Sequence, residues 1–373
     1  MIIRTITCHH AFNHGAMLQA FALVHYLQSL GHDVQVIDYS PYYMPGNPKV
    51  NFKWVPGRFD YFGVRELYRF AKYRQNKYTQ KRQNAIESFY ETCIPVTTNR
   101  YDTVERLRDN PPKADVYIAG SDQIWNTTFP NGKDAAFYLD FGSPKRKISY
   151  AASFATRELE PGTEEFVKHQ LKNFDAISVR EQSGKSLLNS LGFDGQLVVD
   201  PVFLLNREHW DQFDTDSDEL NEEYILTYDF EPKKSAIRSI AKRLADYYSC
   251  KIFTVTSLPS LFCYADKSYF TCGPEMFVRL IKHARCIVSN SFHGTAFSIM
   301  YGKNFFVLDR RDGLNTRMQD LLNRYNLSDR LVDNSVSDDR LFKNINYDIV
   351  FNKLHDDINE SKSFLQQQIE LAQ

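Results

Sequence analysis

The sequence predicts an α/β protein built from two doubly wound, Rossmann-like halves that face each other across a cleft. Short apolar and β-branched runs alternate with helical periodicities along most of the chain, which is typical of parallel sheets covered by helices. Pro201 and the acidic stretch 211–223 interrupt this alternation near the middle of the chain. The length of 373 residues also suits two domains of ordinary size.

The N-terminal half opens with a β-α-β unit. A β-branched run predicts a strand at 2–8, and apolar residues at helical spacing predict a helix that Gly31 terminates. A second strand follows at Val34–Tyr39, so the two strands should be parallel with a right-handed crossover. Prolines then indicate a loop, and a long polar helix is expected at about 64–91. The later elements are strands at Val116–Gly120, Ile148–Ser153, Ala176–Arg180 and Leu197–Asp200, and helices at Thr163–Asn173 and Gln182–Leu191.

The C-terminal half repeats the alternation. Pro274 after Gly273 suits the first turn of a helix. The expected strands are Tyr224–Tyr228, Lys251–Val255, Cys286–Asn290 and Phe305–Asp309, and the expected helices are Lys233–Tyr248, Pro274–Ala284, Thr295–Tyr301 and an amphipathic helix at Tyr347–Leu371. The expected units are an N-terminal domain at 1–205 with a helical insertion at about 60–95, a C-terminal domain at 206–345, and a helix at 346–373 that packs back on the N-terminal domain.

The composition is that of a packed globular protein, with 43% hydrophobic and 24% charged residues. A formal net charge of −1 offers no global field for nucleic acid, and no nucleic-acid-reading module is present. No apolar run reaches the ~18 residues of a membrane span, and the first residues do not resemble a signal peptide. The six cysteines include no CxxC pair, which favours free thiols in a reducing compartment. We therefore expect a soluble cytoplasmic protein.

Ligands of doubly wound sheets bind at the carboxyl ends of the strands, and four loops lie there. The first loop contains Asn13 and Gly15, and this glycine would let backbone N–H groups approach an anion at a helix start. A plain tight turn is the alternative. His9, His10 and His14 crowd the same loop, but no carboxylate follows at a suitable interval. We therefore expect no metal and no cofactor.

The second and third loops follow strands of the same half. The second, 119–126, changes from small polar residues to Trp125 and Asn126, which suits a loop that contacts a sugar. The alternative is a turn that Trp125 anchors to the core. In the third, Arg180 ends an apolar strand, where its guanidinium would bind a carboxylate or phosphate bidentately. An ion pair with Glu181 or another acid is the alternative.

The fourth loop, 288–296, follows a strand of the second half. Ser291 is a capping residue, and Gly294 permits close approach of a ligand to the backbone. His293 lies between a buried strand and a helix start, so we expect it to project into the cleft as a general acid or base. A hydrogen-bonded structural histidine is the alternative. Beyond the next strand, three arginines would bind an anionic substrate or form surface ion pairs: Arg310, Arg311 and Arg317.

Five motifs together resemble the polysaccharide pyruvyl transferase family. They lie in order over roughly residues 4–330, so the resemblance covers nearly the whole chain. The motifs are Asn13-His14-Gly15-Ala16 leading into Leu18-Gln19-Ala20, Gly120-Ser121-Asp122-Gln123-Ile124-Trp125-Asn126, Ser178-Val179-Arg180-Glu181, Asp200-Pro201-Val202-Phe203-Leu204-Leu205 and Ser291-Phe292-His293-Gly294.

The resemblance implies a GT-B-like fold and an enzyme that transfers a pyruvyl group from phosphoenolpyruvate to two hydroxyls of a sugar, giving a cyclic ketal. It implies phosphoenolpyruvate and a glycan or lipid-linked saccharide as partners. The residues expected to act are His293, Arg180 and Asp122 in catalysis, Asn13, Gly15, Arg180, Ser291, Gly294, Arg310 and Arg317 in donor binding, and Trp125 and Asn126 in acceptor binding.

The chain departs from the family pattern at one position. Many members carry an arginine two residues before the histidine, where this chain has Ser291. That arginine would help to hold phosphoenolpyruvate, so Arg310, Arg311 or Arg317 would have to compensate. A non-catalytic glycan-binding relative is therefore one alternative, and a nucleotide-sugar-dependent glycosyltransferase of the same architecture is another.

A basic helix with interleaved aromatic residues is expected between Arg65 and Arg82. It would either dock to a membrane face that presents a lipid-linked glycan, or be a solvated helix whose aromatic residues pack inward.

Overall fold

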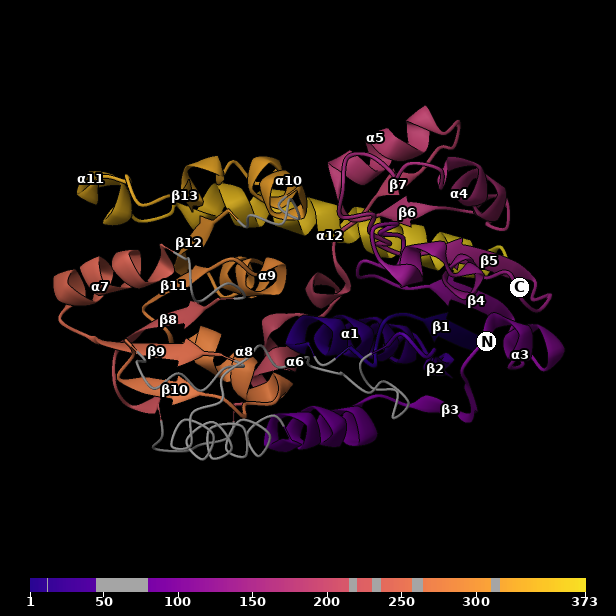
Figure 1. Cartoon of the computed structure of the whole chain (residues 1–373), viewed down its shortest axis with the longest axis horizontal. Coiled ribbons are helices and arrows are strands. Elements are labelled where there is room, and N and C mark those ends of the chain that lie inside the picture. Colours follow the sequence, from indigo (N-terminus) through magenta and orange to yellow (C-terminus); the bar gives the residue numbers. More distant parts are fainter. Residues whose placement is uncertain (12, 45–79, 215–219, 230–235, 257–263, 310–315) are drawn as a thin grey trace, which may run out of the picture.

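Two parallel sheets, one in each half of the chain, form the framework of the protein, and helix α1 lies between them (Figure 1). The architecture is taken from a computed structural model. The structure describes residues 1–11, 13–44, 80–214, 220–229, 236–256, 264–309 and 316–373.

The N-terminal sheet has five parallel strands in the order β3-β2-β1-β4-β5. Its strands are β1 (Ile2–Ile6), β2 (Asp33–Tyr39), β3 (Val96–Tyr101), β4 (Val116–Ala119) and β5 (Arg146–Ser149). A short parallel pair, β6 (Ser178–Val179) with β7 (Gln196–Leu197), continues beyond β5 through isolated bridges. The strand order reverses between β1 and β4, and ligands of such sheets bind at the carboxyl ends on either side of this point.

The C-terminal sheet has six parallel strands in the order β10-β9-β8-β11-β12-β13. Its strands are β8 (Tyr224–Tyr228), β9 (Lys251–Val255), β10 (Lys267–Tyr269), β11 (Cys286–Ser289), β12 (Asn304–Leu308) and β13 (Leu331–Val332). Here the order reverses between β8 and β11, so the loop after β11 occupies the same place as the loop after β4 in the first sheet.

The helices cover both sheets. They are α1 (His14–Ser29), α3 (Val104–Asp109), α4 (Glu164–Leu171), α5 (Gln182–Ser190), α6 (Arg207–Asp211), α7 (Ile237–Tyr248), α8 (Pro274–His283), α9 (Phe292–Met300), α10 (Thr316–Arg324), α11 (Asp338–Leu341) and α12 (Tyr347–Glu370), with 3₁₀ turns at Pro130–Lys133, Ala135–Tyr138, Pro201–Leu204 and Ser328–Arg330. Every residue of α9 is buried, as are most of those of α1. Apolar residues all round a helix are typical of a buried one, which is why these two occupy the centre.

Helix α12 runs across both halves, as the long yellow helix of Figure 1 shows. Near its start, the Tyr347 hydroxyl donates to the Lys303 carbonyl at 2.5 Å, in the C-terminal half. Near its end, the Gln368 side-chain oxygen accepts from Arg146 on β5 at 2.6 Å. The helix therefore links the two sheets.

The predicted architecture of two doubly wound halves is confirmed. The predicted strands next to the reversal points are present within a few residues, and Gly31 has the positive φ of 84° that its place after α1 requires. The helix expected at about 64–91 falls mostly outside the described residues. Within the described residues, 80–93 are helical. Helix α9 begins at Phe292 rather than Thr295, which puts His293 inside the first turn instead of in the loop.

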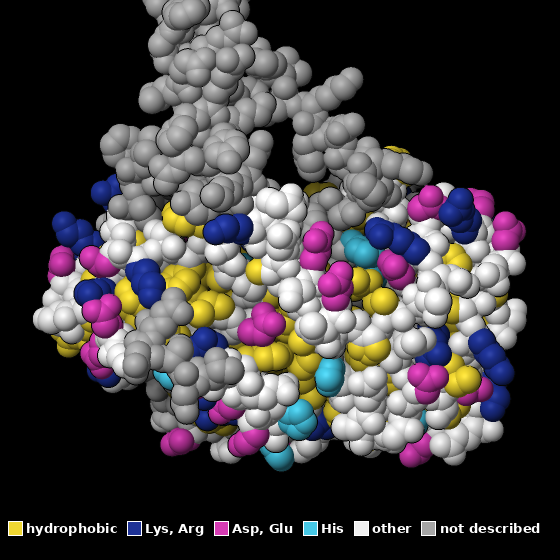
Figure 2. Space-filling view, turned by 90° about the horizontal axis from the view of Figure 1, so that it is seen from below, with side chains coloured by type: hydrophobic (Ala, Val, Ile, Leu, Met, Phe, Trp, Pro, Cys, Tyr) yellow, Lys and Arg dark blue, Asp and Glu magenta, His cyan; other side chains and the backbone are white. Residues whose placement is uncertain are grey.

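The surface carries charges of both signs. Figure 2 shows lysine and arginine side chains interspersed with aspartate and glutamate on the face that it presents, in keeping with a net charge of −1. Within the described ranges, no helix is both long enough and apolar enough to cross a lipid bilayer.

Candidate functional site

The site forms where the first turns of α1 and α9 meet. Each helix begins just after a central strand of its own sheet, and each start is capped by a side-chain oxygen, from Asn13 to the Gly15 amide and from Ser291 to the Gly294 amide. A Cβ added at Gly15 would lie 1.9 Å from Nδ1 of His293, so only a glycine permits this approach. Two helix N-termini, each with a partial positive charge, therefore converge on one place.

Arg180 lies beside these helix starts with a side chain that is 0% exposed. Its Nη1 donates to Oδ2 of Asp200 at 2.6 Å and to the Ser121 hydroxyl at 3.2 Å. Its Nη2 donates to Oδ1 of Asp122 at 3.4 Å, and its guanidinium lies 4.4 Å from the centre of the Phe292 ring. Arg180 thus joins the loops after β4, β6 and β7 to the start of α9.

The two aspartates that Arg180 binds are positioned by their backbones. Asp200 caps the 3₁₀ turn Pro201–Leu204, where its Oδ1 accepts from the Val202 amide at 3.1 Å. Asp122 adopts a left-handed conformation with φ of 75°, which is uncommon for residues other than glycine and is found at functional sites. Burial opposes its ionisation, but Arg180, His293 and Arg317 together outweigh this effect and hold the pKa of Asp122 below its usual range.

His293 lies against Asp200 without a hydrogen bond. Its Nε2 is 3.8 Å from Oδ2 of Asp200 and has no hydrogen-bond partner among the described residues. Burial lowers the pKa of His293 to about 4, and the nearby Asp200 carboxylate only partly offsets that effect. The imidazole is therefore neutral near pH 7 and keeps one nitrogen available for a ligand.

Glu181 is a further buried acid at the site. Its Oε1 accepts from the Ser153 hydroxyl at 2.8 Å and from the Ala155 amide at 3.0 Å. Its Oε2 is 3.7 Å from Nε of Arg180. Burial raises the pKa of Glu181 despite the neighbouring guanidinium. Arg180 therefore fits both interpretations of the sequence, because it forms ion pairs with acids and also lines the candidate site.

A second guanidinium, that of Arg317 on α10, faces the Phe292 ring at 5.8 Å. The Gln123 amide lies beside it, and with its oxygen turned toward Arg317 it accepts from both terminal nitrogens at 2.9 and 3.3 Å. Arg317 also lowers the pKa of Asp122, after the larger influences of burial, Arg180 and His293. Arg310 and Arg311 lie outside the described residues.

Of the residues predicted to bind the donor or catalyse the reaction, those that the structure describes lie together at one place. Asn13, Gly15, Ser291 and Gly294 form the two helix starts, and Arg180, Asp122, His293 and Arg317 surround them. Ser291, at the position of the expected arginine, turns its hydroxyl into the helix as a cap. Asp200 belongs to one of the family motifs, but no role at the site was predicted for it from the sequence, although Asp-Pro after a buried strand is a pattern typical of a turn cap.

Trp125 and Asn126 are placed differently from the prediction. The Trp125 ring is 0% exposed, stacks on Tyr138 and donates from Nε1 to the Phe137 carbonyl at 3.1 Å. Asn126 is equally buried and accepts from the Thr128 amide and hydroxyl. In this structure neither side chain can contact a sugar, and Trp125 acts as the core anchor that the alternative interpretation described.

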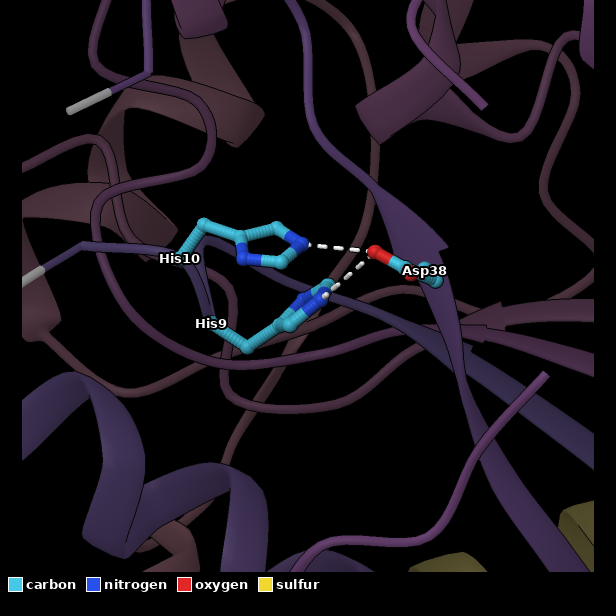
Figure 3. Close-up of side chains that lie close together, drawn as sticks. All are labelled: His9, His10 and Asp38. Carbon is cyan, nitrogen blue, oxygen red and sulfur yellow. Dashed lines mark hydrogen bonds and ion pairs between the residues drawn. The ribbon is translucent and has the colours of Figure 1, made fainter. Parts of the chain in front are cut away.

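The histidines of the first loop separate into two groups. His14 points toward the C-terminal half, where Nε2 donates to the Cys272 carbonyl at 2.9 Å. His9 and His10 instead face Asp38 on β2, as Figure 3 shows. The argument against a metal site was that no carboxylate follows at a suitable interval, and that argument was wrong, because the fold brings Asp38 from the neighbouring strand.

The site is largely enclosed. The side chains of Arg180 and Asp200 are 0% and 1% exposed, whereas those of His293 and Asp122 are 8% and 15% exposed. Among these four, Asp122 and His293 therefore form the side of the cluster that solvent reaches.

Comparisons with solved structures agree with this fold. The match to UDP-N-acetylglucosamine 2-epimerase from Rickettsia bellii covers 100% of this chain and 97% of the epimerase chain, with a TM-score of 0.50 and 12% identity. A glycosyltransferase from Streptomyces nogalater matches over 100% of both chains with a TM-score of 0.48 and 13% identity. At such identities the likeness concerns the fold alone.

The sequence comparison identifies a family. No curated protein matches the chain. The family described as polysaccharide pyruvyl transferase matches residues 13–312, a range that begins at the α1 cap and includes the loops of Asp122, Arg180 and His293. Because this match spans most of the chain, the protein belongs to the polysaccharide pyruvyl transferase family.

Proposed function

We propose that this protein transfers a pyruvyl group from phosphoenolpyruvate to two hydroxyls of a hexose in a cell-surface glycan or its precursor. The observation that carries the proposal is the position of His293. Its Nε2, which has no hydrogen-bond partner within the described segments, lies where two helix N-termini converge. Arg180 is nearby, and Arg317 faces the adjacent Phe292 ring. Such a place favours a small anion beside a group that can transfer a proton.

A second guanidinium and two helix N-termini favour an anionic donor rather than a neutral one. Arg180 is already paired with Asp200 and Asp122, so it chiefly holds the site together. Additional positive potential comes from Arg317 and the starts of α1 and α9. Arg317 thereby takes the place of the arginine that the family pattern has at Ser291.

The reaction follows from these groups. His293 delivers a proton to the methylene carbon of phosphoenolpyruvate, which makes C2 oxocarbenium-like. One sugar hydroxyl adds to C2 and loses its proton to Asp122, whose lowered pKa keeps it ionised. A second hydroxyl then forms the other C–O bond as the C–O bond to phosphate breaks, and its proton leaves with the phosphate. The products are a cyclic ketal and inorganic phosphate.

The low pKa of His293, about 4, is that of the protein without its donor. A bound dianion would raise this pKa toward neutrality, because an opposite charge stabilises the imidazolium form. Binding of the donor thus favours the protonated imidazole, which supplies the proton for the first step.

Thermal shift of the full chain with phosphoenolpyruvate, UDP and GDP tests the proposal. Phosphoenolpyruvate at ~100 times its Kd should stabilise the protein by about 2.7 kcal/mol, whereas UDP, GDP and an equal concentration of sulfate should not. Phosphate release with a panel of p-nitrophenyl hexosides then tests turnover. Stabilisation by UDP or GDP alone would favour a nucleotide-sugar glycosyltransferase, and stabilisation by none of them a non-catalytic relative.

A further inference from the structure

Two histidines and an aspartate meet at the edge of the N-terminal sheet, apart from the contacts that form the His293 cluster. His9 and His10 follow β1, and Asp38 lies near the end of the neighbouring strand β2 (Figure 3). Oδ1 of Asp38 is 2.6 Å from Nε2 of His10 and 3.9 Å from Nε2 of His9. One ligand atom from each residue lies within 4.8 Å of the other two.

The hydrogen bond of His9 fixes which ring nitrogen carries the proton. Nδ1 of His9 lies 3.0 Å from the Thr7 carbonyl, which can only accept, so Nδ1–H is the donor. In the neutral ring, Nε2 then carries a lone pair directed toward the Asp38 carboxylate, which is also an acceptor. This nitrogen is buried in a side chain that is 0% exposed and has no hydrogen-bond partner among the described residues. Two such acceptors can share a cation, either a proton that makes His9 an imidazolium or a metal ion.

We propose that His9, His10 and Asp38 bind one divalent transition-metal ion of the zinc type. This inference goes beyond the proposed pyruvyl transfer and does not depend on it. For metal–ligand bonds of ~2.0–2.1 Å, neighbouring ligand atoms lie roughly 2.9–3.4 Å apart. The two distances to Asp38, 2.6 and 3.9 Å, lie on either side of that range. Shifts of under ~1 Å would therefore complete the geometry.

The ligand types select the ion. Two imidazoles and one carboxylate suit zinc, nickel, cobalt and iron, whereas magnesium and calcium prefer oxygen ligands alone. The Thr7 carbonyl already orients His9 in the way that outer hydrogen-bond partners orient metal-ligating histidines. Three protein ligands leave at least one coordination position for water or a ligand oxygen.

The surroundings permit an ion to enter. The side chains of His10 and Asp38 are 12% and 15% exposed, so that side of the cluster meets solvent. Tyr90 packs against both histidines, with its ring centre 5.5 Å from that of His9 and 5.4 Å from that of His10. Arg100 is the competing cation, with Nε 3.9 Å from Oδ1 of Asp38. Its side chain is 50% exposed and donates to Ser40, so it can give up the carboxylate without being buried unpaired.

Isothermal titration of the chelator-treated full chain with Zn²⁺, Ni²⁺ and Mg²⁺ tests this site. We expect one equivalent of Zn²⁺ or Ni²⁺ to bind and no heat of binding from Mg²⁺. His10→Ala and Asp38→Asn change partly exposed residues and should preserve the fold, as circular dichroism would verify. Each should weaken Zn²⁺ binding by at least ~10-fold, since even outer-shell changes at metal sites have effects of that size.

His283→Ala is the matched control. His283 also contacts a carboxylate, that of Asp214 at 2.9 and 3.0 Å, but Lys282 holds the same carboxylate at 2.7 Å. A cation already occupies that pair, so the variant should bind Zn²⁺ as the unaltered chain does. Absence of Zn²⁺ and Ni²⁺ binding in the unaltered chain, or equal binding by His10→Ala and Asp38→Asn, would overturn the assignment.

Discussion

Helices α1 and α9 begin alike, yet their first-turn histidines have different surroundings. Both nitrogens of His14 are engaged, with Nε2 donating to the Cys272 carbonyl at 2.9 Å and Nδ1 accepting from the Tyr228 hydroxyl at 3.3 Å. His14 also stacks on Phe277 at 4.9 Å. Nε2 of His293 has no such partner in the part of the chain that the structure describes. The same local pattern therefore yields a structural histidine in one half and a histidine available for chemistry in the other.

The comparison shows that the tertiary partners of a side chain, and not the motif around it, decide its role. Burial is the first cause of the lowered pKa of both rings, to about 3 for His14 and about 4 for His293. What differs is that His14 uses its polar atoms to join the two halves of the protein. His293 keeps one polar atom facing the carboxylate of Asp200 at 3.8 Å.

The largest expected effect is a difference in turnover between variants of His293 and His14. His293→Gln should reduce phosphate release from phosphoenolpyruvate by at least ~10²-fold, because the proton donor is lost. His14→Gln should cost stability and leave turnover of the folded protein within a few-fold of the unaltered rate. Phosphate release per folded molecule, with folding followed by circular dichroism, measures both. Equal loss in the two variants would remove the distinction between them.

The next effect probes the contact between the two helix starts. Gly15→Ala would place a Cβ 1.9 Å from Nδ1 of His293, so one helix start must move. Overpacking of this kind typically costs about 1–3 kcal/mol, and we expect loss of phosphoenolpyruvate binding with it. Urea unfolding and thermal shift measure the two consequences.

Gly273→Ala is the control for that experiment, because Gly273 likewise lies at a helix start, as the N-cap of α8. An added Cβ there would meet only the end of the Glu275 side chain within 3 Å, at 2.8 Å, and that end can move away. We expect little change in stability or donor binding. A harmless Gly15→Ala would show that the two helix starts are not held against each other.

A smaller effect concerns the two guanidinium groups. Arg317→Met should weaken phosphoenolpyruvate binding by ~10-fold or more, the size expected for one charged hydrogen bond. Arg180→Met should instead destabilise the protein, because it leaves the 1% exposed Asp200 carboxylate without its cation. Thermal shift with and without the donor separates the outcomes. Normal donor binding by Arg317→Met would show that Arg317 does not replace the missing arginine.

The smallest effect is a difference in pH dependence. The pKa of His14 falls from 6.5 in the unfolded chain to about 3 in the folded one, so the unfolded state binds more protons between these values. Stability is therefore lost as the pH drops through 6.5, by about 1.4 kcal/mol between pH 7.5 and 5.5. His14→Phe should lack this part of the slope in urea unfolding. An unchanged slope would mean that His14 is not buried as a neutral ring.

The sequence predicted the centres of both sheets better than their edges. Strands β8 and β9 have the predicted bounds, because fully buried parallel strands are continuous apolar runs. The edge strands β3, β10 and β13 were missed. Edge strands are short or polar, as the exposed Thr98, Asn99 and Arg100 of β3 illustrate, so they lack that signal.

The site was predictable where a residue followed a predicted strand, and not where a partner came from elsewhere. Arg180 and His293 were found from their places after strands, yet Asp200, which lies beside both, was not. Asp38 was missed as a neighbour of His9 because His9 follows β1, whereas Asp38 lies on β2, far along the chain. Trp125 was misplaced because sequence alone does not show whether an aromatic ring at a strand end points outward or into the core.

The most direct test of the account is a side-chain ¹⁵N NMR titration of the histidines with phosphoenolpyruvate. The chain has ten histidines, and His293→Gln and His14→Gln assign the two that matter. We predict that the donor shifts the His293 resonance and raises the pKa of His293 from about 4 toward neutrality, while His14 stays neutral and unmoved. A His293 signal that ignores phosphoenolpyruvate at saturation, or that responds only to UDP, would contradict the proposed site.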